Sequence, residues 1–461
     1  MKSHVVIIGG GISGLAAAHQ LGEQPVRVTL LEASARLGGT IQTEKRDGFL
    51  LERGPDSFIS EKPQALALAK RLGLESRLIQ TNEQFRRSFI VRNGRLRAVP
   101  EGFQLLAPSR LWPFITSDIF SVFGKARMAA DLLLPRKRAN GISDESLASF
   151  VRRRLGTEAL DRMAQPMVGG IYTADPETLS LRATLPRFLE MERQHRSLIL
   201  AMLRQGRAQK VGTSGARYSL FLSFDQGMQV LVDALERQLK ADVRLNTRAQ
   251  TLKRNVAGWT IVTSDGAELK ADAVCVALPA YLAAGLLSDV HERLAEKLRQ
   301  IKYASTATIN LAYRRAAIKH PLNGFGFVVP FVEKRSLIAC TFSSVKFSGR
   351  APEGHVLLRA FAGGALQPEI FALDEGDMRV MIEIGLRELL GITEDPLFVE
   401  VAKWKDSMPQ YEVGHLERVS EIEGLVNELA GLSLAGNAYR GAGIPDCIRS
   451  GEAAAESFSH E

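Results

Sequence analysis

The 461-residue sequence contains little cysteine and no long apolar run. Its three cysteines, Cys275, Cys340 and Cys447, are widely spaced and form no C-x-x-C pair. This pattern argues against a disulfide framework and a thiolate metal site, and it indicates a reducing compartment. No run of about eighteen uninterrupted apolar residues occurs, and no cleavage signal precedes the first apolar run. We therefore expect a cytoplasmic protein with no membrane-spanning segment.

The residue groupings of hydrolases and metalloenzymes are also missing. The eight histidines are scattered, and neither a His/Asp/Ser arrangement nor a metal-ligand spacing is present. The net charge is +8, but no nucleic-acid recognition motif accompanies it. We therefore expect no metal, no nucleic-acid partner and no catalytic acid–base pair of side chains.

Basic residues cluster in the first third of the chain. The clusters comprise Arg86, Arg87, Arg92, Arg95 and Arg97, residues Arg136–Arg138, and residues Arg152–Arg154. Such clusters suit an anionic substrate or anionic lipid head groups. Solvated loops and helix faces are the alternative interpretation, since most charge runs are no more than that.

The N-terminus carries a strand–glycine–helix pattern typical of dinucleotide binding. The apolar run "HVVII" at 4–8 predicts a buried strand, and a helical pattern follows the glycines. In this frame Gly9 permits the tight turn, Gly11 lets the backbone approach a pyrophosphate, and Gly14 lets helix and strand pack closely. The expected cofactor contacts of this turn are Gly9, Gly10, Gly11, Ile12, Ser13 and Gly14. A second predicted strand ends at Glu32, next to Ala33, where a carboxylate can accept hydrogen bonds from ribose hydroxyls.

A second glycine-rich stretch, "GNAYRGAGIPDCIRSG", lies at 436–451. It does not have the pattern of an ordinary core helix. We predict that it closes over the ring of the cofactor whose other end is held at the N-terminus. The fold that binds the cofactor is then discontinuous in sequence.

Two segments after Glu32 distinguish FAD from NAD. "ARLGGTIQT" and "LLERGPDSF" resemble the R-x-G-G and E-x-G-P segments of the flavin amine oxidase superfamily, which includes the protoporphyrinogen oxidases. In that superfamily the 436–451 stretch is the distal FAD motif, with a helix N-terminus facing the flavin ring. The further FAD contacts that the resemblance implies are Gly38, Gly39, Thr40, Gly54, Pro55, Asp56, Ser57, Ala249, Trp404, Gly436, Ile444, Pro445 and Asp446.

Other segments resemble the protoporphyrinogen/coproporphyrinogen oxidases in particular. They are "GGIYTADPETLSL", "MERQHRSLI", "NGFGFVVP" and "KWKDSMPQYEVGHLERV", in the order of that family. The resemblance implies a heme-biosynthetic oxidation of protoporphyrinogen IX or coproporphyrinogen III by six electrons. Flavin N5 would accept hydride, and dioxygen would reoxidise the flavin to give hydrogen peroxide. Heme biosynthesis is the only reason to expect a ferrochelatase as a partner.

The resemblance also implies a set of substrate contacts. Gly170 would present its carbonyl to pyrrole N–H groups, Phe325 and Val328 would sandwich a pyrrole ring, and Phe361 would lie opposite. The alternatives are core packing for the two phenylalanines and a turn with positive φ for Gly170.

Arg87 is the least direct of these assignments. Mitochondrial-type members have an arginine immediately before an aromatic residue on this strand, paired with a propionate. Here Ser88 lies between Arg87 and Phe89. Either the strand bulges and Arg87 still reaches the substrate, or the contact is lost as in coproporphyrinogen-type enzymes.

These features predict a mixed α/β fold with three parts. A Rossmann-like FAD-binding domain comprises 1–85, 208–285 and 415–461, a sheet-floored substrate domain comprises 86–98 and 286–414, and a helical subdomain comprises 99–207. The helical subdomain carries an amphipathic surface that could face a membrane or pack on a second subunit in a homodimer. We assign to this surface Leu105, Leu106, Leu111, Trp112, Phe114, Ile115, Ile119, Phe120 and Phe123.

Three other functions were weighed. A flavin amine oxidase usually has a lysine where this chain has Thr308, which counts against amine oxidation. The "GIYTADP" and "MPQY" segments argue against a carotenoid-type desaturase. A non-catalytic FAD-binding protein would bind flavin that no porphyrinogen reduces.

Overall fold

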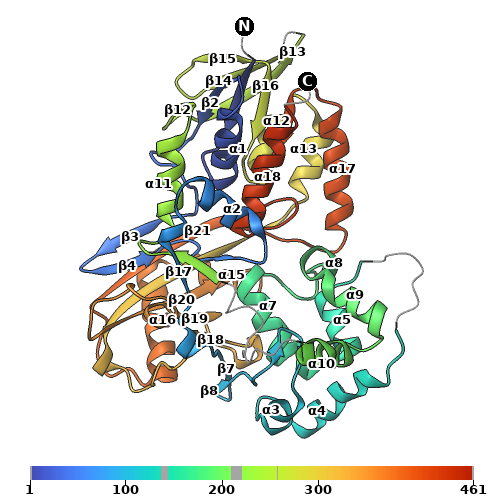
Figure 1. Ribbon diagram of the computed structural model, residues 1–461, viewed down its shortest axis with the longest axis vertical. Coiled ribbons are helices and arrows are strands. Elements are labelled where there is room, and N and C mark those ends of the chain that lie inside the picture. Colours follow the sequence, from blue (N-terminus) through green and yellow to red (C-terminus); the bar gives the residue numbers. More distant parts are fainter. Residues whose placement is uncertain (1–2, 137–143, 209–220, 257, 459–461) are drawn as a thin grey trace.

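The computed structural model describes residues 3–136, 144–208, 221–256 and 258–458 (Figure 1). Its upper part in Figure 1 is built on a five-stranded parallel sheet with the order β12-β2-β1-β16-β22. The strands are β1 (His4–Ile8), β2 (Arg27–Leu31), β12 (Asp242–Arg244), β16 (Ala273–Val276) and β22 (Leu432–Leu434). The sheet thus joins segments from the beginning, the middle and the end of the chain.

Helices cover both faces of this sheet, as expected for parallel strands with apolar side chains on both sides. On one face α1 and α18 pack so closely that a Cβ on Gly451 would lie 2.1 Å from the Ser13 carbonyl oxygen. The helices of this face are α1 (Ile12–Gly22), α2 (Pro63–Arg71), α11 (Gln229–Gln238) and α18 (Ile444–Glu456). The other face carries α12 (Ala280–Leu287), α13 (Glu292–Arg299), α17 (His415–Asn427) and the antiparallel strands β13 (Ala249–Asn255), β14 (Gly258–Thr263) and β15 (Glu268–Ala271).

A seven-stranded mixed sheet forms the second part, with the order β21-β17-β20-β19-β18-β7-β8. Its strands are β7 (Phe89–Arg92), β8 (Arg95–Ala98), β17 (Tyr303–Arg314), β18 (Gly326–Val328), β19 (Ala339–Phe342), β20 (His355–Gly363) and β21 (Phe398–Pro409). One face is apolar and packs against α16 (Glu375–Leu390), with Leu358 and Ala360 of β20 in that core. Because side chains alternate along a strand, Arg359 and Phe361 lie on the opposite face.

Short elements connect the two sheets. The connecting strands are β3 (Thr43–Arg46), β4 (Phe49–Glu52), β5 (Phe58–Ile59), β6 (Leu78–Gln80) and β11 (Phe221–Phe224). The connecting helices include the 3₁₀ turn η2 (Glu83–Phe85), α14 (Ser343–Lys346) and α15 (Pro368–Ala372). Strand β4 leads directly into residues 52–57, which lie between the parallel sheet and the seven-stranded sheet.

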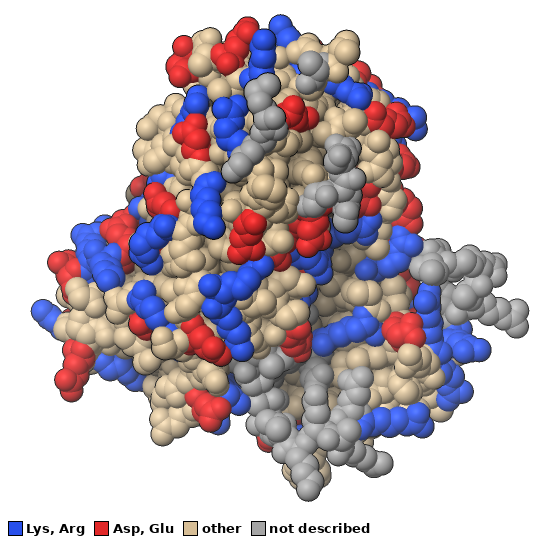
Figure 2. Space-filling view, turned by 45° about the horizontal axis from the view of Figure 1, so that its top comes forward, with Lys and Arg blue, Asp and Glu red and all other residues tan. Residues whose placement is uncertain are grey.

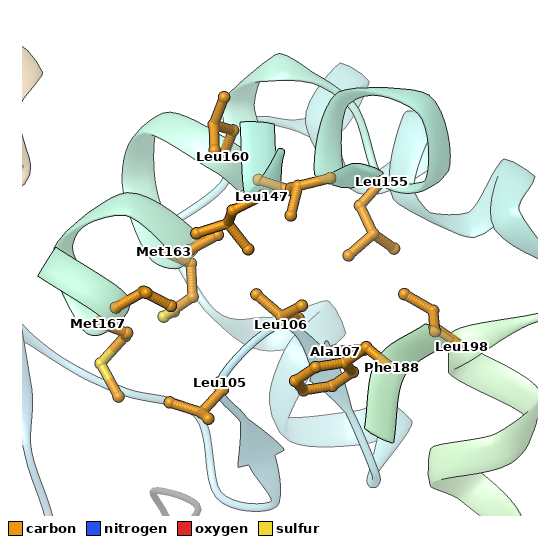
Figure 3. Close-up of a cluster of buried hydrophobic side chains, with 14 of the residues drawn as sticks. Leu105, Leu106, Ala107, Leu147, Leu155, Leu160, Met163, Met167, Phe188 and Leu198 are labelled. Carbon is orange, nitrogen blue, oxygen red and sulfur yellow. The ribbon is translucent and has the colours of Figure 1, made fainter. Parts of the chain in front are cut away.

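The third part is mainly helical and has its own apolar core. Figure 3 shows Leu106, Leu147, Met163, Phe188 and Leu198 of this core pointing toward one another. Its helices are α3 (Leu111–Thr116), α4 (Val122–Ala129), α5 (Leu147–Arg154), α6 (Thr157–Ala159), the π-helical turn Leu160–Ala164, α7 (Gln165–Tyr172), α8 (Leu181–Thr184), α9 (Pro186–His195) and α10 (Leu198–Ala208); the short strands β9 (Phe103–Gln104) and β10 (Ala107–Pro108) pair beside them. A fully buried ion pair between Arg154 and Asp131 holds the helices together, and Asp131 also accepts a 2.6 Å hydrogen bond from the Ser197 hydroxyl.

The mixed α/β class is confirmed, whereas the amphipathic surface assigned to the helical part is only partly correct. Five of the nine assigned residues lie in the helical core, because the turn between β9 and β10, one face of α3 and the segment after α3 fold inward. The buried residues are Leu105, Leu106, Phe114, Ile119 and Phe120. Leu111, Trp112, Ile115 and Phe123 are exposed, together with Val122 and Leu133. Among the described residues, the structure has no helix that is both long enough and apolar enough to cross a bilayer.

Candidate functional site

The turn after β1 leaves an open space at the N-terminus of α1. Gly9 has a φ of +109°, and a Cβ on Gly14 would lie 1.9 Å from the Gly9 carbonyl oxygen. A Cβ on Gly11, by contrast, would meet no described atom within 4 Å. The first turn of α1 has no acidic residue and no side-chain cap among the described residues. Its backbone N–H groups are therefore available to an anion such as a pyrophosphate.

Glu32 lies at the end of β2 and organises the neighbouring loops. Its Oε2 atom accepts a 2.7 Å hydrogen bond from Gly10 N, and its Oε1 accepts one of 2.7 Å from Ser34 N. The Gly38 N–H donates to the Gly10 carbonyl at 2.8 Å, so the Gly38-Gly39 doublet lies beside the glycine turn. The side chains of Ala33 and Thr40 are exposed at this edge. The structure therefore places the glycine turn, Glu32 and the Gly38-Gly39 doublet beside one another.

Residues 52–54 are held by a row of polar side chains from the seven-stranded sheet. Thr308 Oγ1 and Trp404 Nε1 both donate to the Arg53 carbonyl, at 2.5 and 2.8 Å. Asn310 Nδ2 donates to the Glu52 carbonyl at 3.1 Å, and the Arg359 guanidinium donates to the Gly54 carbonyl. Gly54 cannot carry a side chain, since a Cβ would lie 1.7 Å from the Thr40 carbonyl oxygen.

Asp56 makes the main ionic contact of this segment. Its carboxylate pairs with Lys346 at 2.8 Å and lies 3.8 Å from Arg359, and the Ser57 hydroxyl donates to it at 2.7 Å. Burial raises the pKa of Asp56, but the charges of Lys346 and Arg359 outweigh burial and hold that pKa below its usual range. Asp56 is therefore a carboxylate at neutral pH. Pro55 lies half-buried beside it.

Glu52 is a second, more deeply buried carboxyl group in the same segment. It accepts hydrogen bonds from Thr43 Oγ1 at 2.7 Å and from Met228 N at 2.8 Å. Burial raises the pKa of Glu52 to about 6, although these two hydrogen bonds lower it. Because the folded state binds the proton more tightly than the unfolded state, ionising Glu52 costs stability as pH rises.

Glu52→Gln is expected to flatten this pH dependence. Relative to the variant, the natural protein should lose about 1.2 kcal/mol of unfolding free energy between pH 5 and pH 7.5, because a pKa raised from 4.5 to about 6 keeps Glu52 mostly protonated in the folded state at pH 5. Urea unfolding at the two pH values measures the difference. The exposed Glu61→Gln serves as the control. Equal pH slopes for the Glu52 variant and the natural protein would contradict the assignment.

The glycine-rich loop 436–443 leads into α18, which packs beside the first turn of α1. Gly436 has a φ of +138°, and its N–H donates to Ser450 Oγ at 3.0 Å. The helix begins at Ile444 and Pro445 without a side-chain cap at Gly443. Asp446 in its first turn is buried and pairs with Lys62 at 2.5 Å and Arg449 at 3.0 Å.

Three of the predicted substrate contacts share one side of the seven-stranded sheet. Val328 pairs with Ala339 and Ala339 with Phe361 across β18, β19 and β20, so Val328 and Phe361 lie on one face. A Cβ on Gly170 would lie 3.9 Å from Val328 Cγ1, which places the end of α7 over this face. Phe361 also lies 4.8 Å from the Arg359 guanidinium, measured from ring centroid to Cζ.

Two sequence-based alternatives can be revised. Gly170 is not in a turn with positive φ, because it lies inside α7; the left-handed residue is Thr173, at the C-cap. Phe325 is only 2% exposed, which favours the alternative of core packing for this residue.

The Arg87 carbonyl accepts a 2.8 Å hydrogen bond from Phe325 N, so Arg87 lies beside one of the other predicted substrate contacts. It lines a separate surface groove of about 670 Å³ between η2, β8 and α3, together with Arg86, Arg97 and Pro113. Neither Gly170 nor Phe361 lines that groove. The pairing of β7 with β8 begins at Phe89, so Arg87 and Ser88 lie before the paired residues. Figure 2 shows basic and acidic side chains interspersed over the face in view rather than one uniform positive patch.

The residues that sequence reasoning missed come from the seven-stranded sheet and α14. Lys346, Arg359 and Asn310 were not predicted, although all three contact residues 52–56. A usable signal was the single cation in the otherwise apolar strand "VLLRAFAG", because a buried arginine requires a partner. Ala249 is at the start of β13, and nearby Thr247 N donates to the Glu32 carbonyl at 2.8 Å.

The chain is similar to known proteins over nearly its whole length. Residues 12–457 match the model of the flavin containing amine oxidoreductase family. The chain is 38% identical to a coproporphyrinogen III oxidase of Bacillus subtilis, covering 98% of this chain and 97% of the relative. It is 30% identical to a chloroplastic protoporphyrinogen oxidase of Nicotiana tabacum, covering 96% and 83%. A crystal structure from Exiguobacterium sp. 255-15, assigned as a protoporphyrinogen oxidase, superposes with a TM-score of 0.89 at 31% identity over 100% of this chain and 99% of that one.

Proposed function

Because the chain belongs to the flavin containing amine oxidoreductase family, we propose that it is an FAD-dependent porphyrinogen oxidase of heme biosynthesis whose substrate is coproporphyrinogen III. The observation that carries the proposal is the greater similarity, over nearly the whole chain, to a coproporphyrinogen III oxidase than to a plant protoporphyrinogen oxidase. Both relatives are named as oxidases of a porphyrinogen, and this supports a porphyrinogen as the class of substrate.

The residues present fit FAD. The open space beside Gly11 and the uncapped N-terminus of α1 suit its pyrophosphate, and Glu32 suits the ribose hydroxyls. Gly54–Ser57 and the N-terminus of α18 would hold the flavin ring. When bound, the flavin supplies the hydride acceptor of the reaction, and dioxygen is the proposed terminal oxidant.

The protein's own side chains would bind and orient the substrate. The Gly170 carbonyl would accept hydrogen bonds from pyrrole N–H groups, while Val328 and Phe361 would pack on the macrocycle. Thr308, whose hydroxyl donates to the Arg53 carbonyl, would fix the flavin-facing segment rather than act on substrate. A lysine suited to amine oxidation is therefore absent from this position. Catalysis would rest on proximity and orientation.

The position of Arg87 supports the choice of coproporphyrinogen III. The residue immediately before Phe89 is Ser88, which is buried, and Arg87 lines the separate groove. This arrangement favours the alternative in which the arginine–propionate contact of mitochondrial-type enzymes is lost.

Assays with two substrates test the proposed function. The FAD-loaded protein, mixed aerobically with coproporphyrinogen III or protoporphyrinogen IX, should produce fluorescent porphyrin and hydrogen peroxide from both. The value of kcat/KM should be about tenfold higher with coproporphyrinogen III, equivalent to about 1.4 kcal/mol. A preference for protoporphyrinogen IX would contradict the substrate. Peroxide formed from an amine, with no porphyrin from either substrate, would contradict the function.

We further propose that the exposed apolar surface of α3 and α4 makes a peripheral membrane contact. Trp112 is 75% exposed and Phe123 is 88% exposed, and Lys125 lies on the same helix as Phe123. Aromatic side chains beside cations are typical of helices that lie in a membrane interface. The surface comprises Leu111, Trp112, Ile115, Val122, Phe123 and Leu133.

Vesicle binding tests this contact. The variant Trp112→Ser/Phe123→Ser should bind vesicles of phosphatidylglycerol and phosphatidylcholine at least about tenfold more weakly than the natural protein. The variant loses two aromatic side chains that would be buried in the membrane interface. A control variant, Val380→Ser/Ile384→Ser, removes exposed apolar side chains from α16 instead. The proposal fails if both variants bind like the natural protein.

A further inference from the structure

Tyr411 lies at a junction between the flavin-facing loop and the helical part. It follows β21, and its side chain is only 2% exposed. Its hydroxyl donates a hydrogen bond to the Asn437 carbonyl and accepts one of 3.0 Å from Gly441 N. One phenol therefore holds both ends of the turn 437–441, directly before α18.

His415, the first residue of α17, contacts both Tyr411 and the same loop. Its ring stacks on Tyr411 with centroids 4.2 Å apart and an angle of 16° between planes, and its Nε2 lies 2.8 Å from the Tyr439 carbonyl. Only a protonated Nε2 can donate to a carbonyl, so this contact selects that tautomer. Burial lowers the pKa of His415 to about 4, although the hydrogen bond to Tyr439 raises it. The ring is therefore neutral at physiological pH.

The same short segment also contacts the end of α7. Gln410 Nε2 donates to the Tyr172 carbonyl at 3.5 Å, and the Tyr172 ring centroid lies 6.4 Å from that of Tyr411. The Tyr411 carbonyl accepts a 2.7 Å hydrogen bond from Ser180 N, at the start of α8. Tyr172 follows Gly170 by two residues, so residues 410–411 connect the substrate-facing end of α7 with the loop before α18.

We propose that Tyr411, supported by His415, is a positioning residue that sets the flavin-facing loop 436–443 against the end of α7 that presents Gly170. This inference rests on the proposed function for its substrate. Hydride transfer requires donor and acceptor atoms in near contact, and small displacements of either partner cost much of the rate. Tyr411 acts through the backbone of the loop and is not itself a catalytic residue.

The chain offers a matched pair of tyrosines for the test. Tyr411→Phe removes a hydroxyl with two loop partners. Tyr439→Phe removes a buried hydroxyl of the same loop that has no hydrogen-bond partner among the described residues. Removing a satisfied buried hydrogen bond is costly, whereas removing an unsatisfied group is nearly neutral. The two variants thus differ mainly in the contact that the proposal invokes.

Three measurements on the purified holoenzyme are needed: the Kd for FAD, the visible spectrum of the bound flavin, and the rate of flavin reduction by coproporphyrinogen III without oxygen. For Tyr411→Phe we expect a Kd raised about tenfold, an altered flavin band and reduction slowed about tenfold. For Tyr439→Phe we expect Kd and reduction rate within about twofold of the natural protein and an unchanged band.

A Tyr411→Phe protein that matches Tyr439→Phe in Kd, spectrum and reduction rate overturns the proposal, even if its Tm is lower. If Tyr411→Phe does not fold, His415→Phe is measured in its place, since it keeps an aromatic ring but loses the bond to the Tyr439 carbonyl; unchanged Kd and spectrum then overturn the proposal. If no porphyrinogen reduces the natural holoenzyme, the proposed function fails, while Kd and spectrum still decide the role of Tyr411.

Discussion

Alanine at Gly11 should remove FAD from a folded protein, whereas alanine at Gly14 should disrupt the fold itself. A Cβ on Gly11 has free space in the protein but occupies the place where backbone approaches the pyrophosphate, so the Kd for FAD should rise about a hundredfold. A Cβ on Gly14 would lie 1.9 Å from the Gly9 carbonyl oxygen, which forces α1 away from β1. Overpacking of this kind costs about 1–3 kcal/mol or more.

The measurements are flavin content, FAD titration and urea unfolding of the apoproteins. Gly285→Ala is a suitable control, because a Cβ there also meets no described atom within 4 Å and the residue lies inside α12. It should retain FAD and gain about 0.5–1 kcal/mol of stability from helix propensity. Native FAD affinity in Gly11→Ala would refute the assignment of this turn to the pyrophosphate.

Asp56→Asn should destabilise the protein by about 3–5 kcal/mol, as expected when one partner of a buried ion pair is removed. Lys346 and Arg359 are 10% and 4% exposed, so both cations would lose their counter-charge away from water. The segment from Gly54 to Ser57 should loosen, and flavin affinity should fall with it. Because the native pKa of Asp56 is depressed, its stabilising effect is present at neutral pH and is lost as pH falls through that pKa.

Unfolding at pH 7 and FAD titration check this result. Asp47→Asn serves as the control, since the Asp47 side chain is 78% exposed and its contact with Arg46 is a surface pair. It should change stability by less than about 0.5 kcal/mol. An Asp56→Asn protein as stable as Asp47→Asn would show that Lys346 and Arg359 do not depend on the carboxylate.

The parts of the site that could be predicted are those encoded locally. Strand, glycine turn, helix and second strand follow one another in sequence, so their periodicity and spacing predict both the fold and the position of Glu32. Gly38 and Gly54 could be assigned only from the resemblance of their segments to the R-x-G-G and E-x-G-P motifs, and the structure adds that close contacts leave no room for a side chain at either position. The resemblance of the 436–451 stretch to a known motif supplied the distal half.

The remaining parts depend on contacts between distant segments. Arg359 and Lys346 meet Asp56 only after β20 and α14 have packed on the 52–57 segment, and no local pattern encodes that meeting. A turn with positive φ was the alternative for Gly170, because glycine is frequent in turns, but α7 extends through it. The apolar pattern of residues 105–123 predicted one amphipathic surface, yet tertiary packing divides it between core and solvent.

The central parallel sheet has a consequence for biosynthesis. Strand β16 lies between β1, which is translated long before it, and β22, which is translated long after it. Pairings of such long range form slowly, and the partially made chain exposes the edge of β16 until β22 arrives. Uptake of the cofactor must therefore follow translation of α18, and nascent chains stalled before that helix should depend on chaperones to remain soluble.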